Sequence, residues 1–72
     1  MEFDMNNETF NMSIRQFLKM AGINSQREIE QAVARANANN TLKGNEHLPV
    51  KMTLSIDALN LNVSFDGSID LN

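Results

Sequence analysis

Residues 22–29 read Gly22-Ile23-Asn24-Ser25-Gln26-Arg27-Glu28-Ile29, and this stretch predicts the end of one helix and the start of another. Gly22 can adopt the left-handed conformation that closes a helix at little cost. Ser25 and Glu28 have the spacing of a capping box, in which each side chain accepts a hydrogen bond from the backbone amide of the other residue. We therefore expect a tight helix-turn-helix joint, which suits either a DNA-reading element or a plain helical hairpin.

Apolar residues recur at helical spacing on both sides of this joint. They predict a first amphipathic helix over about 7–20 and a second over about 25–38. The apolar stripe of the first helix consists of Phe10, Ile14, Phe17, Leu18 and Ala21, and that of the second consists of Ile29, Ala32, Val33 and Ala36.

Asparagines stand at the outer ends of the predicted helices, and a polar loop over about 40–47 follows them. Asn6 or Asn7 can cap the start of the first helix, because their side chains can accept hydrogen bonds from free amides. Asn39 or Asn40 can close the second helix in a left-handed conformation.

In the C-terminal third the apolar period changes from 3.6 to 2, as in strands that are half buried on one face. The alternation predicts strands over about 49–56 and 61–71, joined by a turn at 57–60. A turn at Asp66-Gly67 is the other candidate, but it would place the flanking apolar residues on opposite faces. The favoured turn sets Ile56 opposite Leu61, Leu54 opposite Val63, Met52 opposite Phe65, Val50 opposite Gly67, Lys51 opposite Asp66 and Ser55 opposite Asn62.

The predicted fold is α+β in ααββ order, with two N-terminal helices packed on a C-terminal antiparallel β-hairpin. We expect a single domain over 1–72, with residues 1–6 disordered. Both strands are sheet edges, and exposed edges invite pairing with another copy. The 72-residue chain has no cysteine and one histidine, so it lacks the usual disulfide or metal support of a small domain. A homodimer is therefore favoured.

The net charge of −3 disfavours nonspecific association with nucleic acid or with anionic membranes. No stretch approaches the length of apolar sequence that a membrane-spanning helix needs. The N-terminus lacks the basic region and apolar run of a signal peptide. These features predict a cytoplasmic protein that makes no membrane contact.

Side chains suited to catalysis or metal binding are few. His47 lies in the predicted loop, and a single histidine with scattered carboxylates does not make a zinc site. Asp66, Ser68 and Asp70 alternate along a strand, whereas a calcium site needs oxygens that curl around one point. The serines are explained by a helix cap and by outward strand positions, so no activated nucleophile is indicated. We predict no enzyme, no cofactor and no metal.

Arg27, Gln31 and Arg35 are spaced by four on the second predicted helix, away from its apolar stripe. They could face base edges or phosphates, and the element order matches the second half of a winged-helix domain. A winged-helix-like DNA-binding regulator that uses helix 25–38 is therefore the alternative function. Acidic residues flank the three side chains, and the predicted wing turn at 57–60 carries no positive charge, which favours a solvated helix face.

Three stretches read Phe10-Asn11-Met12-Ser13-Ile14-Arg15, Ser25-Gln26-Arg27-Glu28-Ile29-Glu30 and Leu48-Pro49-Val50-Lys51-Met52-Thr53-Leu54. They resemble a family of short, uncharacterised bacterial proteins, a domain of unknown function. The resemblance runs from Met5 to about Leu71 and leaves residues 1–4 as an extension. It implies a bacterial cytosolic setting and assigns no functional residues, because the family has no assigned activity.

The function predicted from the sequence is that of a small non-enzymatic protein-interaction module of the bacterial cytosol. Its ligand is expected to be a protein partner or a second copy of the chain, with nucleic acid less favoured. The candidate contact residues are Arg27, Gln31 and Arg35 on the second predicted helix and Lys51 on the first predicted strand.

Overall fold

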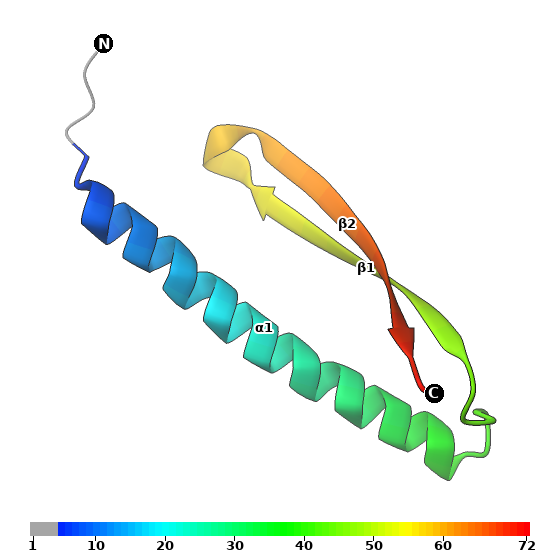
Figure 1. The fold of residues 1–72 in the computed structure, drawn as a ribbon. Coiled ribbons are helices and arrows are strands. Elements are labelled where there is room, and N and C mark those ends of the chain that lie inside the picture. The colour runs from blue at the N-terminus through cyan, green and yellow to red at the C-terminus, as the bar shows by residue number, and fades with distance from the viewer. Residues whose placement is uncertain (1–4) are drawn as a thin grey trace. The chain divides into compact units, whose positions relative to one another are not determined.

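In the computed structural model, which describes residues 5–72, one helix is followed by a β-hairpin (Figure 1). Helix α1 spans Asn7–Ala38, strand β1 spans His47–Ile56 and strand β2 spans Leu61–Asp70. A short 3-10 helix, η1, occupies Asp57–Leu59 between the strands. The predicted α+β class with an antiparallel hairpin is confirmed. The chain divides after Ala38 into two units.

The predicted joint at residues 22–29 is wrong, because α1 continues through it without interruption. The two helices predicted over about 7–20 and 25–38 are therefore one helix, and the order is αββ rather than ααββ. Gly22 lies in the helix interior, where glycine costs only about 1 kcal/mol relative to alanine. Ser25 likewise lies inside the helix and caps nothing.

The two predicted apolar stripes lie on the same side of α1, which is why a single helix can present both. Ala21 and Ile29 are eight positions apart, slightly more than two helical turns, and Ser25 lies midway between them. All three residues are half-buried. A straight continuation of the helix therefore aligns the stripes, so that no turn is needed to bring them to one surface.

The winged-helix hypothesis depended on the joint. Residues 25–38 form the C-terminal part of α1 rather than a separate helix that follows a turn. A recognition helix is oriented by a preceding helix that crosses the DNA backbone, and α1 contains no such pair. The structure gives no support for DNA binding.

Both ends of α1 are formed by the expected asparagines. Asn6 is the N-cap, and its Oδ1 accepts a hydrogen bond of 3.0 Å from the Thr9 amide. At the other end Asn40 has a φ of 57°, in the left-handed region that closes helices. Glu8 in the first turn and Arg35 in the last turn have the charges that the helix dipole favours at these ends.

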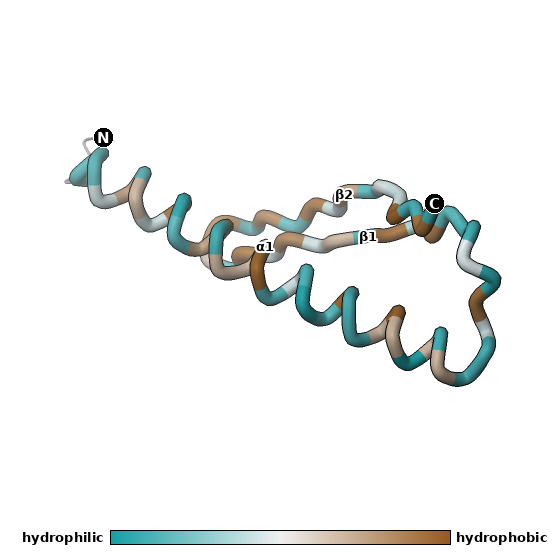
Figure 2. The backbone as a smooth tube through the Cα atoms, turned by 60° about the horizontal axis from the view of Figure 1, so that its bottom comes forward, coloured by the Kyte–Doolittle hydropathy of each residue, from teal (hydrophilic) through white to brown (hydrophobic). Residues whose placement is uncertain are grey.

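The hairpin register is confirmed at every predicted pair, from Ile56 opposite Leu61 to Val50 opposite Gly67. The pairing also extends further than expected, to His47 opposite Asp70. His47 is therefore the first residue of β1, and the loop predicted over 40–47 ends one residue earlier. Figure 2 shows hydrophobic residues distributed along both strands and along α1.

The turn between the strands lies where it was predicted, at residues 57–60. The Asn60 amide donates a 3.1 Å hydrogen bond to the Asp57 carbonyl. Asn60 has a φ of 51°, a left-handed conformation that asparagine tolerates better than most residues. Ser55 also donates to the Asp57 carboxylate, so that the end of β1 is tied to the turn.

Three predictions are not tested by these elements. The expected disorder of residues 1–6 falls mainly on residues 1–4, which lie outside the described residues. The packing of helical residues on the hairpin and the single domain over 1–72 stay predictions.

Candidate functional site

The apolar stripe of α1 runs along the whole helix. Most of its members recur at intervals of eleven positions, a repeat of about 3.67 residues per turn that lies close to the natural helix period. The stripe therefore stays nearly in line on a straight helix. We define it as Phe10, Ile14, Phe17, Leu18, Ala21, Ser25, Ile29, Ala32, Val33 and Ala36.

The side chains of the stripe become smaller from the N-terminal to the C-terminal part of α1. Its N-terminal part is bulky and exposed, with Phe17 50% and Leu18 57% accessible. From Ala21 onward it contains mostly small residues, of which Ser25 and Ala36 are half-buried. The stripe thus offers large apolar side chains at one end of α1 and a smoother surface at the other.

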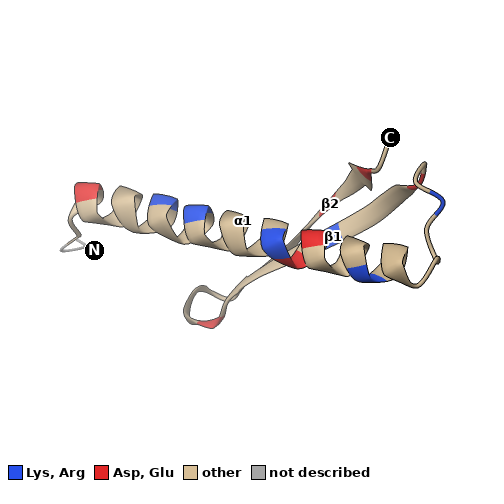
Figure 3. Cartoon of the chain, turned by 90° about the horizontal axis from the view of Figure 1, so that it is seen from below, with Lys and Arg blue, Asp and Glu red and all other residues tan. Residues whose placement is uncertain are grey.

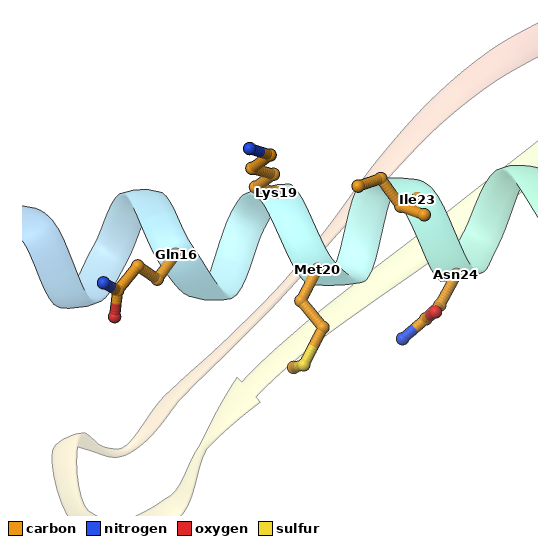
Figure 4. A pocket seen from close by; sticks show the side chains of 5 residues that line it. All are labelled: Gln16, Lys19, Met20, Ile23 and Asn24. Atoms are coloured by element: carbon orange, nitrogen blue, oxygen red, sulfur yellow. The ribbon is translucent and has the colours of Figure 1, made fainter.

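A shallow hollow lies on the other side of α1. It is lined by Gln16, Lys19, Met20, Ile23 and Asn24, all from this helix (Figure 4). Sequence reasoning missed it because it followed a single stripe. The signal was present, since Met20 and Ile23 are three positions apart and both are about half exposed. An open hollow of aliphatic groups with one amine and two amides suits a protein contact rather than a reaction.

The hairpin has one apolar face. Val50 and Leu54 on this face are half-buried, whereas Met52 and its cross-strand partner Phe65 are 50% and 60% accessible. Side chains of directly opposite residues lie close together, so this pair forms one exposed apolar patch. We define the hairpin apolar face as Leu48, Val50, Met52, Leu54, Ile56, Leu61, Val63, Phe65, Gly67 and Ile69.

No side chain is buried among residues 5–72. Both the stripe and the hairpin apolar face therefore keep large side chains accessible to solvent. Contiguous exposed apolar surface on a small protein is typical of a site that contacts another macromolecule.

The predicted contact residues do not form one cluster. Arg27, Gln31 and Arg35 are all exposed on α1, a helix along which basic and acidic residues are interspersed (Figure 3). Steps of four residues turn by about 40°, so the row moves around the helix, and Arg35 borders the stripe. Lys51 is exposed on β1 opposite Asp66, in the other unit. Arg35 thus lies at the margin of the stripe, Arg27 lies well away from it, and Lys51 belongs to the polar face of the hairpin.

The polar face of the hairpin carries a small hydrogen-bonded cluster. The His47 Nδ1 lies 2.8 Å from Asp70 Oδ1, and the Ser68 hydroxyl donates to the same oxygen at 2.9 Å. His47 and then Ser68 lower the pKa of the Asp70 carboxyl below its usual value, because both hydrogen bonds favour the charged form. The hydroxyl hydrogen of Ser68 is directed to a carboxylate rather than to the imidazole, unlike an activated nucleophile.

The loop before β1 is organised by Glu46. Its carboxylate accepts hydrogen bonds from the amides of Lys43 at 2.8 Å and Gly44 at 2.9 Å. The Lys43 amide contributes most to lowering the pKa of the Glu46 carboxyl below its usual value. The φ of Gly44 is 98°, a conformation that side chains rarely adopt. Residues 43–46 therefore form a specific turn, as the Lys43-Gly44-Asn45 sequence indicated.

This turn should loosen in acid. A carboxyl group whose pKa is lower in the folded than in the unfolded protein stabilises the fold at pH values above its pKa in the unfolded protein. This stabilisation is lost as the pH falls through the pKa of the group in the folded protein. In a carboxyl-carbon NMR titration we expect Glu46 to titrate at lower pH in the native protein than in urea. The amide shifts of Lys43 and Gly44 should follow the same curve. Flat amide shifts through the Glu46 titration would contradict the hydrogen bonds, and Glu46→Gln serves as the control.

Residues 5–72 hold no group of three or more His, Cys, Asp or Glu side chains placed to bind a metal. α1, the single long helix in this part of the chain, is not apolar enough to cross a membrane.

The comparisons with known proteins identify a family and no relative of known activity. Residues 5–72 match the profile of a family of unknown function, DUF6494. The resemblance to a domain of unknown function is thereby confirmed. Neither the curated proteins nor the solved structures gave a match.

Proposed function

The chain belongs to DUF6494, a family of unknown function, and from that premise we propose that it is a non-enzymatic protein-interaction module of the bacterial cytosol. Its ligand is a protein surface, supplied by a partner or by a second copy. The bacterial cytosolic setting follows from the family resemblance.

The observation that carries this proposal is the accessible apolar surface on the hairpin. Met52 and Phe65 face each other across the strands, and each exposes half or more of its surface. Full burial of an exposed side chain of this size contributes about 1.5–3 kcal/mol, so covering the part that each of these two still exposes contributes roughly half of that. A protein surface that covers this pair and its neighbours would gain much of the energy that a specific complex needs.

The polar face of the hairpin supports the same proposal. Its side chains bond to one another, as in the 3.1 Å contact between the hydroxyls of Thr53 and Ser64. Groups that satisfy one another in this way are suited to facing solvent while the other side of the sheet is covered. Arg27, Gln31 and Arg35 on α1 and Lys51 on β1 remain proposed polar contacts of the module.

The test is capture of proteins from a native bacterial lysate by the full chain, with nuclease added to remove nucleic acid. The double variant Met52→Ser/Phe65→Ser should capture at least about tenfold less protein than the unchanged chain, because a loss of about 1.4 kcal/mol of binding free energy weakens the affinity tenfold. Thr53→Ala/Ser64→Ala is the matched control, since it changes the adjacent cross-strand pair on the polar face. It should capture as the unchanged chain does. Equal capture by both variants, or none by the unchanged chain together with a monomeric mass, would contradict the proposal.

A further inference from the structure

We propose that the apolar stripe of α1 is a self-association surface, on which the α1 of a second copy lies antiparallel. This inference rests on the proposed function, and it identifies the partner that binds the stripe as a second copy of the chain. Three properties of the helix carry it: the length of the stripe, the period of the stripe and the gradient of side-chain size.

The length of the stripe requires a long partner. From Phe10 to Ala36 the stripe is about 39 Å long at about 1.5 Å per residue. A ten-residue strand reaches only about 33 Å, so neither of the described strands can cover the stripe from end to end. An element of matching length is available in every solution of the protein, namely α1 of another copy. Helices of this composition also gain most of their stability from packing rather than from intrinsic propensity.

The period of the stripe permits contact along that length. The eleven-residue repeat links Phe10 with Ala21 and Ala32, and it links Ile14 with Ser25 and Ala36. Because this repeat is close to the natural period of an α-helix, the stripe deviates little from a straight line. Two nearly straight helices can therefore keep their stripes in contact over many turns.

The size gradient selects the antiparallel direction. When two helices align antiparallel about residue 23, the bulky half of each stripe faces the small half of the other. Phe10 then lies opposite the partner's Ala36, and Ile14 lies opposite the partner's Ala32. A parallel pair would set bulky residues against bulky residues and small against small, which leaves gaps where the small residues meet. Interiors need close packing, so the antiparallel pair is favoured.

The helix dipoles agree with the same direction. Each α1 carries partial positive charge at its N-terminus and partial negative charge at its C-terminus. Antiparallel alignment sets opposite ends side by side, which is favourable, whereas parallel alignment sets like ends side by side.

The first test compares two identical substitutions on opposite sides of α1. Ile14 lies on the stripe, and Ile23, nine positions later, lies about 180° around the helix. They are 41% and 50% accessible, so either position accepts a charge in the isolated chain. In analytical ultracentrifugation of the full chain, Ile14→Glu should raise the dimer dissociation constant at least about 100-fold. The dimer interface would bury two copies of the new charge, one from each chain, and burying an unpaired charge is costly. Ile23→Glu should change it less than about threefold. Circular dichroism checks that both variants keep the helix.

The second test reads the direction of the helices, and it remains informative if Ile14→Glu fails to fold. The chain has no cysteine, so single cysteines report without background. Ile14→Cys and Ala32→Cys are made in separate chains, mixed in equal amounts and oxidised. The antiparallel pair should give mainly the mixed disulfide between the two variants, and Ile23→Cys alone should give none. Mainly homodisulfides would overturn the direction.

The remaining outcomes separate this inference from the proposed function. A chain that stays monomeric and still captures a protein through the hairpin apolar face would overturn the second copy as partner and leave the proposed function intact. A dimer that Ile23→Glu disrupts and Ile14→Glu does not would place self-association on the other side of α1 and would also overturn the inference. A monomeric chain that captures nothing would contradict both.

Discussion

Replacing Gln26 with proline should lower the free energy of unfolding by about 3 kcal/mol or more. Gln26 lies in the middle of α1, where proline removes the amide that would bond to the Gly22 carbonyl and places its ring against that carbonyl. If residues 22–25 formed a joint instead, Gln26 would be the first residue of a helix, a position that proline favours. Urea unfolding with detection of the helical signal at 222 nm therefore distinguishes one helix from two.

Two further variants control for the loss of side chains and for the role of glycine. Gln26→Ala loses an exposed 3.3 Å hydrogen bond to Glu30 but gains helix propensity, so it should remain within about 0.5 kcal/mol of the unchanged chain. Gly22→Ala should raise stability by about 0.5–1 kcal/mol, because a Cβ at Gly22 meets no atom within 4 Å. A stable Gln26→Pro combined with a destabilised Gly22→Ala would contradict the continuous helix.

Replacing Asn60 with proline should have the next largest effect, about 2–4 kcal/mol. Proline fixes φ near −65°, whereas Asn60 has a φ of 51°, so the native conformation of the turn is not accessible to it. The substitution also removes the amide that bonds to the Asp57 carbonyl. The loss of the turn should abolish the cross-strand NMR contacts between Met52 and Phe65, which belong to the native register.

Asn60→Gly is the matched control for the turn. Glycine adopts left-handed conformations readily and retains the amide, so the register and the stability should be nearly unchanged. Retention of the Met52 and Phe65 contacts in Asn60→Pro would show that residues 57–60 do not determine the register. Contacts between Phe65 and Ser68 in the unchanged chain would contradict the pairing itself.

The hairpin could be predicted from the sequence because two constraints agree there. Side chains alternate strictly between the two faces of a strand. The two candidate turns therefore differ in whether Val63 and Ile69 lie on the same face of the hairpin. Only the turn at 57–60 keeps both residues on one face, and the structure has that turn. The pair of His47 and Asp70 was within reach of the same reasoning, since it extends the predicted register by only a few residues. The sequence instead places the histidine in the loop, because residues 40–47 form a polar stretch.

The joint could not be excluded because its signals are local and weak. A glycine inside a helix lowers stability by about 1 kcal/mol, and a capping residue at a helix start raises it by about the same amount. Both features are tolerated in the interior of a helix. The opposing signal was the common phase of the two stripes across Ser25, which makes a straight helix as consistent with the apolar pattern as a bent pair. The hollow around Met20 and Ile23 was missed for a related reason, since both residues lie off the stripe.

The eleven-residue repeat of the stripe also bears on how the length of α1 can vary in evolution. Eleven residues make three turns with a remainder of about 20°, so an insertion or deletion of that length leaves the two ends of the stripe on one side. A change of five residues rotates one end against the other by about 140° and divides the surface. Relatives with longer or shorter helices are therefore expected to differ by about eleven residues, or by three or four residues, which rotate one end of the stripe by only about 60° or 40°.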